Sequence, residues 1–212
     1  MDFQHEARQQ GSWTIPAGSK VLIELSLIRP KQQNDCPDPF LGESKNGLRS
    51  LFIKCLVVAG TYDGHYFYDR IWAPGFLQKI ALNEGQEKAC ARGGAMIRAF
   101  LEAANNISPD DASGRAQSCR VIDSFSELNG LRFPVCVGLN PEPVEKNGVV
   151  YWNNVLYQVV TPDDPDFRHV MDGGEVLTNG PIICASSREK ARAAQNAADE
   201  TNEPSQGWGT DF

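Results

Sequence analysis

Three segments in the first third of the chain alternate between apolar and polar residues, as β-strands with one buried face do. They are KVLIELSLIR (20–29), the more apolar SLFIKCLVVAG (50–60) and HYFYDRIWA (65–73). Asp63 and Gly64 lie between the last two segments and form a dipeptide that is typical of a tight hairpin turn. The pattern therefore predicts three strands, of which the second and third form a hairpin.

The segment from 77 to 105 has the residue types and spacing of a helix. From Glu87 onward its apolar residues recur at roughly helical intervals. Gly93 and Gly94 interrupt the good helix formers, so we expect them to weaken or kink the middle of the helix.

Strand character returns after the helix. LRFPVCVGL (131–139) alternates again, and Pro134 predicts an edge strand or a bulge because it cannot donate a hydrogen bond to a neighbouring strand. VVYWNNVLYQVV (149–160) predicts a strand pair or one bent strand. The segments 30–47 and 106–117 are rich in Pro, Asp, Asn and Gly or Ser, and they predict loops.

The order of three strands, a helix and two strands predicts a mainly β protein. We expect a five-stranded OB-fold barrel with a helix between strands 3 and 4. Another small antiparallel sheet with one helix is the alternative. Residues 1–19 predict an N-terminal arm and 20–185 the OB-fold domain. Residues 186–212 predict an exposed helix, at 187–200, and a flexible, disordered acidic tail.

Acidic residues are concentrated in the last third of the chain. The 212 residues have a formal net charge of −7. Residues 20–132 carry 14 Lys and Arg against 13 Asp and Glu, whereas residues 133–212 carry 5 against 12. A basic binding surface followed by an acidic tail produces such an asymmetry. A solvated acidic face is the alternative.

Other bulk features narrow the class of protein. The first ten residues are too polar for a signal peptide, and no apolar run approaches the length that spans a bilayer. We therefore expect a cytoplasmic protein without a membrane partner. The six cysteines include no CxxC pair, which favours reduced, buried thiols over a zinc site.

The third predicted strand carries the most informative pattern for function. It places Tyr66, Tyr68, Arg70 and Trp72 on one face, at every second residue. Aromatic rings form stacking platforms for nucleobases, and a guanidinium binds phosphate or stacks on a ring. The alternative is an aromatic core. We favour the platform because strands 2 and 3 and the loop before them are the usual binding elements of an OB-fold.

Other residues extend this platform. The expected stacking residues are Tyr66, Tyr68, Trp72, Trp152 and Phe52, with partial burial as the alternative for Trp152. The expected phosphate-binding residues are Arg29, Lys31, Lys45, Arg49, Lys54, Arg70 and Arg132.

The sequence has few features of an enzyme. It holds three histidines and no HExxH, GxSxG or P-loop pattern. DDPDFRH (163–169) supplies carboxylates of the kind that bind Mg²⁺, but its prolines favour an acidic loop. We therefore expect a non-enzymatic protein with no catalytic residue, cofactor or metal. A metal-dependent enzyme that uses the carboxylates of residues 163–172 is an alternative.

The run LFIKCLVVAGTYDGHYFYDRIW (51–72) resembles the strand–turn–strand signature of small OB-fold proteins from phage and prophage replication or recombination regions. NGLRFPVCVGL (129–139) and NGVVYWNNV (147–155) resemble their last two strands. This resemblance spans residues 20–160. It implies a phage-type single-stranded DNA-binding protein, which coats single strands non-specifically and ends in a flexible acidic tail with a terminal aromatic residue.

The end of the chain fits this resemblance in part. Residues 199–212 hold four acidic residues, no Lys or Arg, and a final Phe212, but only Asp211 is acidic among the last seven. Bacterial single-stranded DNA-binding proteins often end in a denser acidic run followed by Pro-Phe. The resemblance implies that Trp208, Asp211 and Phe212 contact replication or recombination proteins, or fold back over the DNA-binding groove and compete with DNA.

These observations together predict sequence-independent binding and protection of single-stranded DNA in phage DNA replication or recombination, in the cytoplasm of a bacterial host. A homodimer is compatible with the sequence. The alternative from another class is a phage structural or scaffolding protein that uses the barrel for protein–protein contact.

Overall fold

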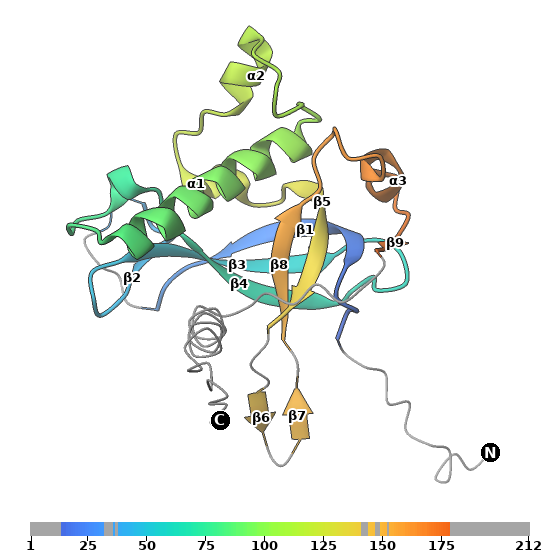
Figure 1. Ribbon diagram of the computed structural model, residues 1–212, viewed down its shortest axis with the longest axis horizontal. Coiled ribbons are helices and arrows are strands. Elements are labelled where there is room, and N and C mark those ends of the chain that lie inside the picture. The colour runs from blue at the N-terminus through green and yellow to red at the C-terminus, as the bar shows by residue number, and fades with distance from the viewer. Residues whose placement is uncertain are drawn as a thin grey trace, which may run out of the picture.

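The computed structural model describes residues 14–31, 36, 38–140, 144–146, 149–151 and 153–178. The predicted arm up to residue 13, the predicted helix at 187–200 and the acidic tail lie outside these residues, as does Trp152. In the described part, an antiparallel sheet lies beneath one long helix, α1 (Glu84–Ala104) (Figure 1). The prediction of a mainly β protein is confirmed.

Seven strands form the main sheet. They are β1 (Ser19–Ile28), β2 (Leu41–Glu43), β3 (Arg49–Val57), β4 (Tyr66–Trp72), β5 (Arg132–Leu139), β8 (Asn154–Val159) and β9 (Val176–Leu177). The order is β2-β3-β1-β5-β8, with β4 also paired to β3 and β9 to β1. Two short strands, β6 (Val144–Lys146) and β7 (Val149–Tyr151), form a separate ladder that projects from the ends of β5 and β8 (Figure 1).

The alternation in the sequence determines which face of the sheet is buried. In β1 and β3 every second residue is buried, as expected for strands with one face against a core. The inward residues Ile23, Leu25 and Ile53 are fully buried and share one hydrophobic cluster with residues of α1. Phe100 of α1 stacks on Phe133 of β5, with ring centroids 4.8 Å apart. Helix α1 therefore covers the apolar face of the sheet.

Helix α1 begins later than the pattern predicts. Asn83 caps it: the Asn83 side chain accepts a hydrogen bond from the Gln86 N–H, and the Gln86 side chain accepts one from the Asn83 N–H. Glu84 and Glu87 add negative charge to the first turn, where the helix dipole favours it. The helix runs without a break through Gly93 and Gly94, the two residues expected to weaken or kink its middle. A Cβ at position 93 would lie 1.9 Å from the Trp72 carbonyl oxygen, so glycine permits α1 to approach β4 closely.

Several short elements lie in segments that the sequence predicted as loops. Strand β2 lies within 30–47, and helix α2 (Gly114–Cys119) overlaps the loop at 106–117. The acidic segment after β8 contains helix α3 (Phe167–Met171), where Phe167 and Val170 are buried. The 3₁₀ turns η1 (Gly75–Leu77) and η2 (Phe125–Leu128) flank α1. Each of these elements is too short to show a periodic pattern.

Pro134 does not mark an edge strand. It lies in β5, which pairs with β1 on one side and β8 on the other, and its partner in β1 is Leu22. The Pro134 carbonyl accepts a hydrogen bond from the Val160 N–H. The predicted irregularity is present two residues later, where the register against β8 shifts between Cys136 and Val137.

Two features complete the described part of the chain. It contains five cysteines, of which Cys55, Cys90 and Cys136 are buried. Burial raises the pKa of the Cys55 thiol well above its usual value, and the nearby Asp69 carboxylate adds to the rise. None of the helices described is long and apolar enough to cross a membrane.

Candidate nucleic-acid interface

Strand β4 presents its aromatic residues to solvent. Tyr66 and Tyr68 are each 56% exposed, and Arg70 is also exposed. Phe67 and Ile71, on the other face of the strand, are buried in the core. The tyrosines therefore do not fill the core. Their rings lie 5.6 Å apart at an interplanar angle of 72°, a T-shaped contact.

The outward residues of β3 extend this row. In the ladder between the two strands, Phe52 pairs with Arg70 and Lys54 pairs with Tyr68. The Arg70 guanidinium lies over the Phe52 ring, 4.4 Å from its centroid, and the Lys54 ammonium lies 4.6 Å from the centroid of Tyr66. Cations and rings thus alternate across both strands. We call this surface the aromatic face; it comprises Phe52, Lys54, Tyr66, Tyr68, Arg70 and Trp72.

Trp72 lies at one end of the aromatic face. It is half-buried, and the Arg70 guanidinium lies 5.6 Å from its ring centroid. Arg70 therefore lies between two rings, which hold the guanidinium near the surface in a position to meet an anion. The face combines flat apolar surfaces with fixed positive charges, which are the two requirements for binding bases and phosphates.

A concavity of about 610 Å³ adjoins the tyrosines. Its lining includes Tyr66, Tyr68 and Asp69 from β4 and the amides Asn140 and Asn153 beside the β6–β7 ladder. The aromatic face therefore continues into a hollow with polar walls rather than ending at a flat edge. Neither asparagine could be predicted from the sequence pattern, because their proximity to β4 depends on how β8 lies beside β4.

Asp69 was not predicted as a site residue, yet it lines this concavity. Its carboxylate accepts hydrogen bonds from the backbone N–H of Arg70, at 2.7 Å, and of Leu156 in β8, at 2.9 Å. Burial raises the pKa of Asp69, and these two hydrogen bonds and the charge of Arg92 oppose the rise. The bond to Leu156 joins β4 to β8, between which the described residues form no strand ladder.

Six of the seven residues predicted to bind phosphate have exposed or half-buried side chains. Arg29, Lys31 and Lys45 are exposed in or near the loops that flank β2. The Arg29 guanidinium lies 5.3 Å from the Phe40 ring centroid. Arg132 is exposed but binds the Glu24 carboxylate through two nitrogens, at 2.9 and 2.7 Å. Lys54 and Arg70 belong to the aromatic face.

Arg49 is buried, contrary to the expectation that it lies at the rim. It is 5% exposed, its guanidinium donates a hydrogen bond to the Leu77 carbonyl, and it lies 3.6 Å from the Glu43 carboxylate. Its side chain contacts the segment between β4 and α1 and does not reach the aromatic face. The remaining predicted site residues, Trp152, Trp208, Asp211 and Phe212, lie outside the described residues.

The acidic segment at 163–169 binds a cation of the chain itself. The Lys20 ammonium lies 2.8 Å from the Asp164 carboxylate and 2.7 Å from that of Asp166. Burial opposes the charge on Lys20, but the two carboxylates outweigh burial and raise the pKa of Lys20. This arrangement attaches the turn before α3 to β1. Among the described residues, no group of three or more His, Cys, Asp or Glu side chains could hold a metal ion.

Comparisons with known proteins found no similarity to report. No protein-family model, curated protein or solved structure matches the chain. Function is therefore inferred from the geometry of the aromatic face and the concavity beside it.

Proposed function

We propose that the protein binds single-stranded DNA without sequence preference, through the aromatic face of β3 and β4. The observation that carries this proposal is the exposed row of Tyr66, Tyr68 and Arg70, extended across the strand ladder by Phe52 and Lys54. Exposed rings beside fixed cations accept any base by stacking and any phosphate by charge, because neither contact depends on the identity of the base.

The energetics favour a single strand over a duplex. A base stacked on an aromatic side chain contributes roughly 1–3 kcal/mol, and stacking requires a base whose face is free. In a duplex the base faces are already covered by neighbouring base pairs. The rings of Tyr66 and Tyr68 are therefore suited to an unpaired strand, and the cations beside them to its phosphates.

We further propose that the five long strands form an OB-type barrel. Strands β1, β3, β4, β5 and β8 follow one another in the chain in the expected order, and α1 lies between β4 and β5. The hydrogen bond between Leu156 and Asp69 holds β8 against β4, which supports closure of the sheet at this edge. Binding on the face of the second and third long strands is the usual mode for such barrels.

The role that fits this binding is non-enzymatic protection of single strands during phage DNA replication or recombination, inside a bacterial host. The charge distribution is compatible with this role. Residues 20–132, which contain the aromatic face, are close to neutral, and the excess of acidic residues lies after residue 132. A bound strand would lie against the near-neutral part of the protein.

A fluorescence titration tests the proposal. The chain holds four tryptophans, and Trp72 lies in the aromatic face, so a bound strand is expected to quench tryptophan emission. An oligo-dT strand should bind at low salt, with affinity falling on a log–log plot by about 0.7 per phosphate contact as salt rises. A duplex of equal length is the control. An unchanged emission with oligo-dT at low salt would overturn the proposal, and equal affinity for the duplex would contradict selectivity for single strands.

A further inference from the structure

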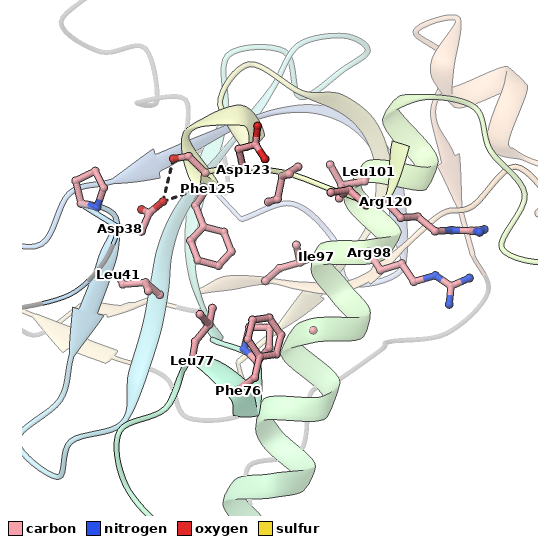
Figure 2. A pocket seen from close by; sticks show the side chains of 16 residues that line it. Asp38, Leu41, Phe76, Leu77, Ile97, Arg98, Leu101, Arg120, Asp123 and Phe125 are labelled. Atoms are coloured by element: carbon pink, nitrogen blue, oxygen red, sulfur yellow. Dashed lines mark hydrogen bonds between the residues drawn. The ribbon is translucent and has the colours of Figure 1, made fainter. Parts of the chain in front are cut away.

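An apolar groove of about 590 Å³ lies on the α1 side of the molecule and shares no lining residue with the concavity at the aromatic face. It runs between α1, η1 and η2. Figure 2 shows Phe76, Leu77, Ile97 and Phe125 gathered around it, contributed by three separate elements. Because α1 covers the inward face of the sheet and the aromatic face points outward, the groove and the aromatic face can be occupied at the same time.

The edges of this groove are unusually apolar for a solvated surface. Phe76 is 85% exposed and Val121 is 70% exposed, although both are large apolar side chains. The floor beneath them is buried and apolar, with Leu41, Ile97 and Leu101. An exposed aromatic residue above an apolar floor, with a cavity between them, is typical of a site that binds an apolar side chain.

Positive charge lies at one end of the groove. Arg98 and Arg120 line that end (Figure 2). Both guanidinium groups donate to the same Glu102 oxygen, each at 2.7 Å. Two cations thus share one buried carboxylate. Arg120 is 17% exposed, and it also donates to three backbone carbonyls. The Arg98 side chain is 53% exposed, so a second carboxylate can approach it.

The opposite end of the groove carries negative charge. The Asp38 carboxylate accepts hydrogen bonds from the Ser124 hydroxyl and the Phe125 N–H, and Asp123 is exposed beside them (Figure 2). A ligand that fits the groove therefore has apolar side chains for the middle and a carboxylate for the Arg98 end, directed away from Asp123.

We propose that this groove binds the segment of this chain that contains Trp208, Asp211 and Phe212. The segment holds two aromatic residues for the apolar middle and a carboxylate next to one of them for Arg98. Residues 199–212 carry four acidic residues and no Lys or Arg, so their charge is complementary to the Arg98 end. The 27 residues between Thr178 and Gln206 span up to about 90 Å when extended, which exceeds the size of the domain.

This inference differs from the placements that the sequence suggested, which were a separate partner protein or the DNA-binding surface. It does not depend on the proposed function, because the groove is separate from the aromatic face. The test therefore contains no nucleic acid, and its failure would leave the proposal of single-strand binding as it stands.

Photocross-linking in the full-length chain tests the inference. The photoreactive residue p-benzoylphenylalanine replaces Phe76, the chain is irradiated, and the cross-linked peptides are identified by mass spectrometry. The same probe at Tyr66, an exposed aromatic residue of the aromatic face, is the matched control. We expect cross-links from position 76 to residues 199–212 and none from position 66. A second probe, at Val121, repeats the test should the probe at position 76 disturb folding.

A charge variant then tests the proposed contact with Arg98. Arg98→Gln should lower the yield of the cross-link about two- to fivefold, as expected for the loss of a partly exposed ion pair. Arg115→Gln, at an exposed position on α2 that does not line the groove, should leave the yield unchanged. Absence of cross-links to 199–212 from both groove probes, or cross-links to 199–212 only from position 66, would overturn the inference.

Discussion

The Asp69 carboxylate on β4 accepts a hydrogen bond of 2.9 Å from the Leu156 N–H on β8. These residues lie 87 positions apart in the chain, on strands that share no ladder pairing in the described structure. Asp69 also lies between Tyr68 and Arg70, so the bond connects the strand of the aromatic face to β8, whose Asn154 and Val155 also line the concavity. A single half-buried carboxylate thus stabilises both the sheet and the position of the aromatic face.

Removal of this carboxylate should destabilise the fold. Asp69→Ala leaves the N–H groups of Arg70 and Leu156 without the acceptor that they have in the native chain. We expect the free energy of unfolding to fall by roughly 1–3 kcal/mol, the usual cost of unsatisfied buried donors. Urea denaturation measures it, and Asp63→Ala, at an exposed position in the turn between β3 and β4, is the control. Equal stability of the two variants would contradict the role assigned to Asp69.

The same carboxylate predicts a pH dependence of stability. Burial raises the pKa of folded Asp69 above its usual value of 3.8, so in the acidic range the folded state binds more protons than the unfolded state. The contribution of Asp69 to stability therefore falls as pH rises from the unfolded-state pKa through the folded-state pKa. Asp69→Asn lacks this titration. Urea denaturation at several pH values gives the unfolding free energy of the native chain and of Asp69→Asn. The difference, native minus variant, should decrease as pH rises through this range. An increase of the difference with pH would contradict a raised pKa of Asp69 in the folded state.

Local patterns in the sequence predicted the faces of the long strands correctly, whereas contacts between distant segments were missed. The exposed row of Tyr66 and Tyr68 follows from period-2 alternation alone, because backbone geometry places alternate side chains on opposite faces. The burial of Arg49 does not follow from this alternation, because it depends on the path of the segment after β4, which brings the Leu77 carbonyl to the Arg49 guanidinium. The link from Asp69 to Leu156 and the groove beside Phe76 likewise require the three-dimensional fold.

Substitution of Tyr68 should weaken DNA binding without unfolding the protein. Tyr68 is 56% exposed, so Tyr68→Ala removes little buried surface, whereas loss of a stacked base should weaken affinity for oligo-dT roughly 5- to 150-fold. Leu177→Ala removes an exposed apolar residue outside both the aromatic face and the groove beside α1, and should leave the affinity unchanged. Titrations of both variants, with thermal melts to check folding, make the comparison. A similar loss of affinity in both would argue against stacking on Tyr68.

The cations of the aromatic face should account for part of the salt dependence. Lys54→Gln removes the ammonium that lies over Tyr66, and the slope of log affinity against log salt should become shallower by about 0.7. Lys88→Gln, on the exposed side of α1, removes the same charge from the chain at a distance from the face. The slope of Lys88→Gln should match that of the native chain. If both variants changed the slope equally, net charge rather than a specific phosphate contact would be responsible.

Substitution of two adjacent glycines in α1, Gly93 and Gly94, tests the close approach of this helix to β4. A Cβ on Gly93 would lie 1.9 Å from the carbonyl oxygen and 2.9 Å from the carbonyl carbon of Trp72, and backbone atoms of a paired strand cannot move away easily. A Cβ on Gly94 would lie 3.6 Å from Pro74, an ordinary contact. Gly93→Ala should therefore lower the free energy of unfolding by about 1–3 kcal/mol or more, as overpacked sites do.

Gly94→Ala should leave the fold unchanged or stabilise it by up to about 1 kcal/mol, because alanine favours helices over glycine. Both substitutions bring the same gain in helix propensity, so the difference between their unfolding free energies isolates the contact with Trp72. Urea denaturation of the two variants measures that difference. Equal stability would contradict the close approach of α1 to β4, in which a Cβ on Gly93 would lie 1.9 Å from the Trp72 carbonyl oxygen. A large difference in stability, together with weaker binding of oligo-dT by Gly93→Ala, would link the packing of α1 to the position of Trp72 in the aromatic face.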